Sequence, residues 1–262
     1  MSKRIILLLL ILTMFIWAAN FYVVKIALLY YSPMAVAAFR FLFAVIVLYG
    51  VVAAKQKTLK IKCSFSLKEW LYLFLTSFFG VYLTIYFFNK GLTTASPINS
   101  SLIIATTPIF TAIFARFLMK GSLSFWQWIS IFLSIFGVAF LLVKGDLTEL
   151  LRLQISEGDF YIVLMSIVLA LSQIIVSKYL KHVDSILLTT VTCAMALVLF
   201  ILSCIPELIS VPVSTSFDFW TSILFMGILG TGLGYAVFYL SIVELGATKT
   251  TLFMNLIPFF VV

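Results

Sequence analysis

Residues 94–110, TASPINSSLIIATTPIF, decide the fold together with residues 244–260, ELGATKTTLFMNLIPFF. Both stretches begin as a short turn, continue as an apolar run and carry a proline at the same depth. The order and near-constant offset of further matches indicate an internal duplication, with one half in residues 1–144 and the other in 158–262. A shift of 150 residues, or of 153 near the start of each half, pairs Trp70 with Trp220, Gly80 with Gly230, Phe88 with Phe238, Pro108 with Pro258, Asn20 with Gln173 and Lys25 with Lys178.

The composition places this duplicated chain in a lipid bilayer. Apolar residues make up 64% of the 262 residues, charged residues make up 10%, and the mean hydropathy is +1.23. A soluble domain averages roughly 45–50% apolar and about 25% charged residues. Because backbone polar groups in lipid need internal partners, and the runs lack the alternation of barrel strands, we predict an all-α polytopic membrane protein. Its apolar runs lie at about 5–24, 34–53, 69–88, 98–118, 125–143, 159–178, 186–206, 219–240 and 248–262.

The positive charges predict the orientation of these runs. When the N-terminus is placed inside, twelve of the 17 Lys and Arg residues fall on the cytoplasmic side and four fall outside, which is the bias that orients membrane proteins. The formal charge of +8 therefore reflects short loops between apolar runs rather than a nucleic-acid surface. We predict a cytoplasmic N-terminus, in the plasma membrane of a bacterium or archaeon, with no nucleic acid as a partner.

Each half contains five helices, an odd number, so the second half must enter the membrane upside down. The loop at residues 55–62 carries four lysines, whereas its counterpart at 207–218 carries two acidic residues and no Lys or Arg. This opposite sign is what inverted insertion requires. Inverted repeats recur in secondary transporters, whose substrate sites lie between the halves. The sequence ends within the ninth span, so we expect nine spans to be present and a tenth to be missing.

Chemistry-bearing residues are sparse in this sequence. The cysteines Cys63, Cys193 and Cys204 form no CxxC pair, and the one histidine, His182, lies in a short polar loop. We therefore expect no metal site, no disulfide framework and no cofactor. No acidic residue falls in the middle of a span, and neither HExxH nor GxxxxGK[ST] occurs. These absences argue against an intramembrane enzyme and against ATP-driven pumping.

The motifs resemble the drug/metabolite transporter superfamily, and within it the EamA-like ten-helix exporters. The resemblance rests on WAANF at residues 17–21 followed by Lys25, on AFRF at 38–41 after a Ser-Pro pair, and on the stretches 94–110 and 244–260. It implies a bundle whose central cavity is lined by helices 1, 3, 4, 6, 8 and 9, with helices 5 and 10 at the periphery. The missing tenth helix departs from the family pattern but leaves the implied cavity intact. The motifs do not specify the substrate.

Amides within spans are the first candidates for substrate binding, because polar residues in lipid are costly and mark functional sites. Asn20 and Gln173 are equivalent under the repeat, and we expect both to bind substrate. Hydrogen bonding between helices is the alternative role for them. Trp17 lies one turn before Asn20 and shares its face, so it either lines the same cavity or packs there.

Tyrosines provide a second set of candidates. Tyr82 and Tyr86 lie on one stripe of the third helix, and Tyr235 and Tyr239 repeat the same spacing in the eighth helix. We expect Tyr82, Tyr86 and Tyr235 to line a cavity with their apolar faces and hydroxyls. Tyr239 fits the aromatic belt at the membrane interface equally well. Asn255, in the ninth helix, completes the expected substrate-binding set.

Three further residues are expected to have structural or gating roles. Pro108 and Pro258 each remove a backbone hydrogen bond inside a span, so they are candidates for kinks that gate a transport path. Arg40 is the basic residue that lies well within a span, and its repeat counterpart near Cys193 is apolar. We expect Arg40 to anchor the fold or to cap backbone carbonyls, and binding of a substrate carboxylate is the alternative.

These observations predict a secondary transporter and not an enzyme, most simply an exporter of amino acids or related small metabolites by alternating access. Sugars, nucleosides or drugs are the alternative substrates. An intramembrane enzyme or a non-transporting membrane partner is the alternative function. The expected partners are a small-molecule substrate and the lipid bilayer, and formation of a homodimer is left open.

Overall fold

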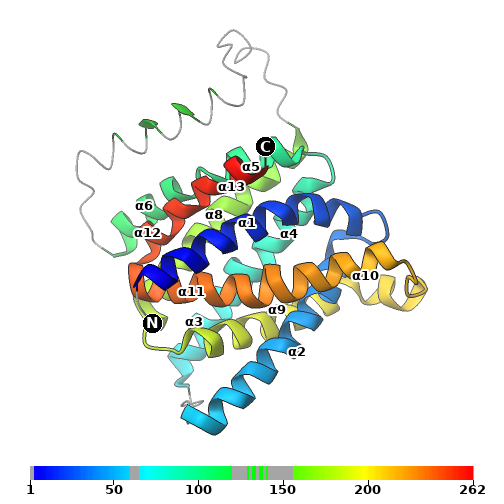
Figure 1. The fold of residues 1–262 in the computed structure, drawn as a ribbon, viewed down its shortest axis with the longest axis horizontal. Helices are drawn as coiled ribbons and strands as arrows, with labels where there is room; N and C mark the ends of the chain where they lie inside the picture. Colours follow the sequence, from blue (N-terminus) through cyan, green and yellow to red (C-terminus); the bar gives the residue numbers. More distant parts are fainter. Residues whose placement is uncertain are drawn as a thin grey trace.

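The computed structural model describes residues 3–59, 65–119 and 156–261, together with six isolated helical positions between residues 129 and 140. The α-helices of these ranges are labelled in Figure 1. The first half contains α1 (Lys3–Ala27), α2 (Pro33–Leu59), α3 (Leu67–Ser77), η1 (Phe78–Leu83), α4 (Thr84–Leu92), α5 (Pro97–Ile104) and α6 (Thr107–Leu118). The second half contains α8 (Glu157–Ile175), η3 (Val176–Leu180), α9 (Ser185–Ser210), α10 (Phe217–Leu224), η4 (Phe225–Leu233), α11 (Gly234–Leu245), α12 (Ala247–Leu252), η5 (Phe253–Asn255) and α13 (Leu256–Val261).

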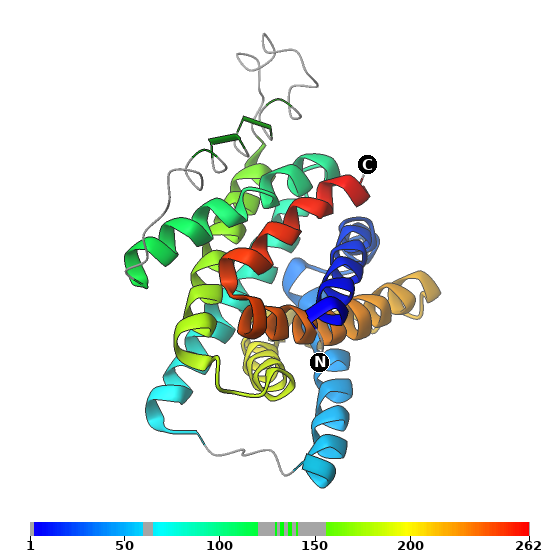
Figure 2. The same cartoon turned by 60° about the vertical axis from the view of Figure 1, so that its left-hand side comes forward.

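The bundle is held together by contacts between its two halves. The helix α1 packs against α11 and α13, and α8 packs against α4 and α6. Figure 1 shows α1 between α13 and α11, and Figure 2 again shows α13 beside α1. Under the offset of the predicted repeat, α1 corresponds to α8, α11 to α4 and α13 to α6. The same pair of contacts therefore occurs twice, each time between a helix of one half and helices of the other.

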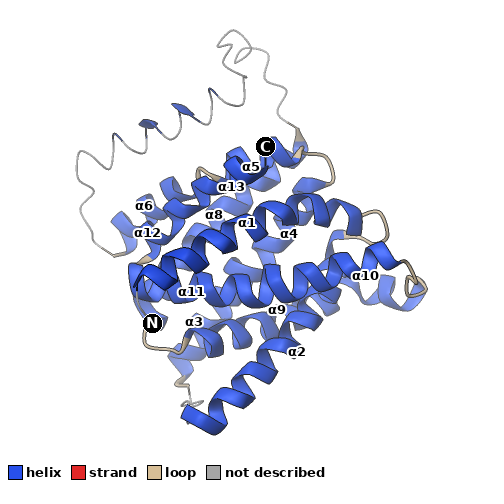
Figure 3. Cartoon of the chain, in the orientation of Figure 1, coloured by secondary structure: helices blue, strands red, loops and turns tan. Residues whose placement is uncertain are grey.

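Among the residues that the structure describes, seven helical runs are long and apolar enough to cross a membrane. Within the described residues only helices joined by loops occur, and no strand is present (Figure 3). The protein is therefore a polytopic α-helical membrane protein. The expected ninth run is described from residue 247 to Val261, as α12, η5 and α13, and is shorter than the seven. The expected fifth run, 125–143, lies outside the described residues apart from the isolated positions, so nine spans stays a prediction.

Short polar motifs set where the helices begin. At α3 the Ser66 hydroxyl accepts the Glu69 backbone N–H at 3.3 Å, and the Glu69 carboxylate accepts the Ser66 backbone N–H at 2.7 Å. Ser156 and Asp159 form the same reciprocal pair at the start of α8. Each pair satisfies N–H groups that the first helical turn leaves without a partner. The polar loops between the apolar runs thereby fix the register of the helices that follow.

Two helices are interrupted at equivalent depths under the predicted repeat. The helix α5 ends at Ile104 and α6 begins at Thr107, while α12 ends at Leu252 and α13 begins at Leu256. Pro108 and Pro258 follow these interruptions directly. A proline has no N–H to donate and its ring clashes with the carbonyl four residues earlier, which accounts for both breaks.

Candidate functional site

A cavity of about 50 Å³ lies inside the bundle, with room for a few water molecules. Its wall is built from both halves, by α1, α2, α4 and α5 from the first and by α8, α11, η5 and α13 from the second. Aromatic and aliphatic side chains form most of this wall. The side chains that bring polar atoms to it are those of Trp17, Asn20, Arg40, Thr84 and Tyr235.

The π-helical segment η4 positions three of these polar residues. Hydrogen bonds in a π-helix span five residues instead of four, which widens the turn. The Trp17 indole Nε1 donates a 2.9 Å hydrogen bond to the Gly230 carbonyl, and a β-carbon at Gly230 would lie 2.5 Å from the Asn20 amide nitrogen. The Arg40 Nε donates a 2.5 Å hydrogen bond to the Thr231 hydroxyl. Glycine at position 230 is what allows α1 to approach η4 this closely.

Arg40 is a buried cation in the cavity wall. It is 2% exposed, and its Nη1 has no hydrogen-bond partner. In the described part of the chain its titratable neighbours are Tyr235 and Cys193 rather than an aspartate or glutamate. Its Cζ lies 5.9 Å from the ring centroid of Phe41. Within the described residues its side-chain hydrogen bond goes to the Thr231 hydroxyl and not to a backbone carbonyl. The bond anchors the side chain but leaves most of its N–H donors available.

Asn20 brings an unsatisfied acceptor to the same wall. Its side chain is 3% exposed, and its Oδ1 has no hydrogen-bond partner. Buried polar atoms are satisfied in the great majority of cases, so an unsatisfied one that lines a cavity suggests a missing ligand or water. The cavity therefore offers a cationic donor from α2 and an amide acceptor from α1.

Gln173, the repeat counterpart of Asn20, lies outside this cavity. Its side chain is fully buried, and its Oε1 accepts a 3.1 Å hydrogen bond from the Thr111 hydroxyl of α6. This contact fits the alternative role considered for Gln173, a hydrogen bond between two helices. Its Nε2 has no hydrogen-bond partner, and substrate binding by Gln173 stays a prediction.

The tyrosines of the third run also lie outside the cavity wall. The Tyr82 hydroxyl is 2.8 Å from the Ser203 hydroxyl of α9, and the Tyr86 ring lies 6.5 Å from the ring of Tyr161 on α8. The face of α4 that lines the cavity is instead the one with Thr84, whose hydroxyl also donates to a carbonyl of η1 at 2.8 Å. Of the tyrosines expected at the cavity, Tyr235 of α11 is the one that the structure places there.

In the ninth run, the residues that line the cavity are neighbours of Asn255, which was the residue expected there. Asn255 is exposed, whereas Met254 and Ile257 line the cavity. Pro108 and Pro258 are buried and sit beside the two helix interruptions. Their position fits a hinge, and gating by them stays a prediction.

Several lining residues were missed by the sequence reasoning. Met165, Leu169, Met254 and Ile257 are apolar residues in helices that are apolar on every side, so no periodic signal marks their inward face. Thr84 carried a usable signal, because it is a hydroxyl within an apolar run.

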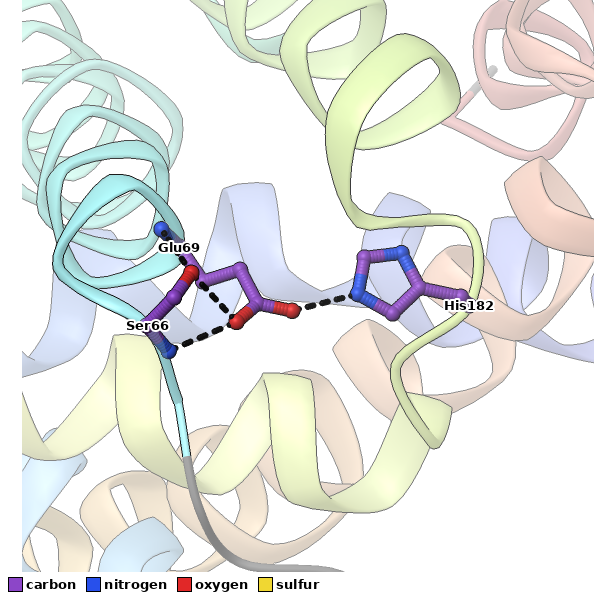
Figure 4. Close-up of polar contacts among 3 residues, drawn as sticks. All are labelled: Ser66, Glu69 and His182. Atoms are coloured by element: carbon purple, nitrogen blue, oxygen red, sulfur yellow. Dashed lines mark hydrogen bonds and ion pairs between the residues drawn. The ribbon is translucent and has the colours of Figure 1, made fainter.

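At one end of the bundle the start of α3 meets the loop after η3. The His182 Nε2 lies 2.6 Å from the Glu69 Oε1, and the same carboxylate closes the capping box with Ser66 (Figure 4). The rings of Tyr72 and Tyr179 stack nearby, with centroids 4.1 Å apart and planes at 7°. We call this set of contacts the Glu69–His182 junction.

Under the predicted repeat, the equivalent place is the end of α1 against the start of α10. The Tyr31 hydroxyl donates to the Pro212 carbonyl at 2.9 Å and accepts the Ser214 backbone N–H at 2.8 Å. The Tyr31 ring lies 5.0 Å from the ring of Phe219, and Phe219 is the repeat counterpart of Glu69. We call these contacts the Tyr31 junction.

The sequence matches the EamA-like transporter family over residues 4–143 and 156–262. A Bacillus subtilis protein named uncharacterized transporter YyaM is 31% identical over 243 residues, which cover 92% of this chain and 78% of the relative. An uncharacterized transporter of Archaeoglobus fulgidus is 29% identical over 253 residues, which cover 97% of this chain and 85% of the relative. A solved crystal structure of another protein shares the fold, with a TM-score of 0.69 and 15% identity, covering 98% of this chain and 86% of that one.

The chain belongs to the EamA-like transporter family. This confirms the resemblance to the drug/metabolite transporter superfamily that the motifs carry. It also makes the protein an integral membrane transporter rather than an enzyme, in agreement with the names of its bacterial and archaeal relatives.

Proposed function

We propose that this protein is a secondary transporter that exports amino acids or related small metabolites by alternating access through the central cavity. The observation that carries the proposal is the cavity between the halves, in whose wall Arg40 and Asn20 keep buried polar atoms without partners. Sugars, nucleosides or drugs are the alternative cargo.

The proposed architecture is two inverted five-helix repeats, residues 1–144 and 158–262, with nine spans present. Its support comes from the recurrence of equivalent contacts, α1 with α11 and α13 in one place and α8 with α4 and α6 in the other. The paired interruptions before Pro108 and Pro258 support it as well. So does a π-helical segment in both the third and the eighth run, η1 and η4.

Support for alternating access comes from the small size of the cavity and from the contacts at the two ends of the bundle. A volume of about 50 Å³ is far below the roughly 300–1,000 Å³ of ordinary ligand pockets, so the bundle must open to admit a metabolite. Opening at one end requires the Glu69–His182 junction to separate, and opening at the other requires the Tyr31 junction to separate. With the N-terminus in the cytoplasm, the first junction faces the cytoplasm and the second faces outward.

Counterflow in liposomes tests the proposal. The purified protein is reconstituted, loaded with an unlabelled metabolite mixture and supplied with one labelled metabolite at a time. We expect saturable exchange of at least one metabolite, strongly reduced by Asn20→Ala. The matched control is Asn99→Ala, which removes an amide of α5 that does not line the cavity. Absence of exchange across amino acids, sugars, nucleosides and cationic drugs would rule the proposal out.

A further inference from the structure

We infer that Arg40 binds a carboxylate of the transported molecule while Asn20 accepts a hydrogen bond from a donor beside that carboxylate. The substrate class is then small carboxylic acids with a neighbouring N–H or O–H group and an apolar remainder, namely apolar amino acids and 2-hydroxy acids. This inference rests on the proposed transport function and narrows it.

The charge of Arg40 has no counter-ion among the described residues. A guanidinium has five N–H donors, of which Nε binds Thr231 while Nη1 has no partner. Burying a charge is unfavourable unless an opposite charge accompanies it, and within the described ranges no carboxylate forms an ion pair with Arg40. A contact with the Phe41 ring offsets only part of this penalty. The planar guanidinium matches a carboxylate with two parallel hydrogen bonds.

Both polar residues, Arg40 and Asn20, pack against the same segment, η4. A β-carbon at Gly227 would lie 2.7 Å from the Arg40 backbone oxygen, and one at Gly230 would lie 2.5 Å from the Asn20 amide nitrogen. Arg40 on α2 and Asn20 on α1 are therefore packed against successive turns of η4, and both line the same cavity. A ligand with a carboxylate and an adjacent donor would satisfy both residues at once.

The rest of the cavity wall is mainly apolar. Phe21, Phe88, Ile104, Met165 and Leu169 are apolar and line the same space. The hydroxyls of a sugar would lose water there without gaining partners, which is unfavourable. An aliphatic or aromatic side chain attached to the carboxylate-bearing carbon would gain from burial against these residues.

Competition of counterflow separates the recognised groups. The probes are L-leucine, its 2-hydroxy analogue 2-hydroxy-4-methylpentanoate, L-leucinamide, which lacks the carboxylate, and isopentylamine, which keeps only the amine. We expect the first two to compete and the last two to be weaker on the order of thirtyfold, because each leaves the buried cation unpaired. Equal competition by L-leucine and L-leucinamide overturns the inference. Exchange of sugars, nucleosides or amides without exchange of acids also overturns it, while leaving the transport function standing.

The substitution Arg40→Gln distinguishes binding from a structural role. It keeps hydrogen-bond donors but removes the charge, so we expect affinity for L-leucine to fall on the order of thirtyfold while that for L-leucinamide is retained. A structural residue would lower both equally, and that result contradicts the inference. Lys25→Gln, which removes a charge at the end of α1 outside the cavity wall, is the matched control and should leave the ratio unchanged. If Arg40→Gln does not fold, the ratio measured on the unsubstituted protein decides.

Discussion

The substitution Gly230→Ala is predicted to damage the cavity through a single methyl group. The β-carbon of alanine would lie 2.5 Å from the Asn20 Nδ2, 2.9 Å from Oδ1 and 3.1 Å from Cγ. Because all three atoms of the amide group are too close, rotating the amide about its last bond does not relieve the clash. Either Asn20 leaves its position or α1 moves away from η4, which also strains the Trp17 hydrogen bond to the Gly230 carbonyl.

The expected effect is moderate for stability and larger for transport. Overpacking costs about 1–3 kcal/mol, and alanine recovers about 0.5–1 kcal/mol because it restricts the unfolded chain more than glycine does. From the middle of both ranges, the net loss of unfolding free energy is about 1 kcal/mol. Displacing the Asn20 acceptor would remove the proposed hydrogen bond to substrate, which should lower affinity on the order of tenfold.

Thermal unfolding in detergent and counterflow in liposomes measure the two effects. The matched control is Gly232→Ala in the same segment, where a β-carbon would meet only the Gly227 carbonyl oxygen, at an ordinary 3.4 Å. We expect Gly232→Ala to keep both the melting temperature and the exchange rate. If Gly230→Ala and Gly232→Ala behave alike in both assays, close packing of η4 is not what places Asn20.

Three further predictions concern other contacts. Gly80→Ala would bring a β-carbon 2.4 Å from a serine hydroxyl of α8 and, by the same subtraction, should lower the unfolding free energy by about 1 kcal/mol; an unchanged melting temperature would contradict the close crossing. Trp17→Phe removes the 2.9 Å hydrogen bond to Gly230 and should lose about 1 kcal/mol in the same assay, and full retention of stability would show that the bond contributes nothing. Glu69→Gln weakens the exposed contact with His182, so global stability should hardly change. It should instead speed labelling of a cysteine engineered in the cavity wall from the cytoplasmic side. Unaltered labelling would show that the Glu69–His182 junction does not limit access to the cavity.

The composition and the apolar runs indicated a membrane protein, and several cavity residues could be predicted from the sequence for a related physical reason. A polar side chain is conspicuous in an apolar run, because the bilayer makes it costly unless something pairs with it. Asn20, Arg40 and Tyr235 were singled out in this way, with Trp17 one turn from Asn20, and all four line the cavity. The shared prolines of the repeat likewise predicted interruptions that the structure contains.

What could not be predicted is which side of each helix faces inward. The third run is apolar on most sides, so the stripe with Tyr82 and Tyr86 was as plausible as the one with Thr84, and only tertiary packing distinguishes them. The π-helical segments have no sequence signature of their own. The contact of His182 with Glu69 joins residues 113 positions apart, and nothing local to either residue indicates it.

The proposed transport mechanism depends most on the two halves having opposite orientations in the membrane. Lys68 and Asp218 occupy equivalent exposed positions at the start of α3 and α10. Each is replaced by cysteine in a background without Cys63, Cys193 and Cys204, and cells are treated with a membrane-impermeant maleimide. The account predicts that Asp218→Cys reacts in intact cells while Lys68→Cys reacts only after the membrane is opened; labelling of both from the same side would contradict it.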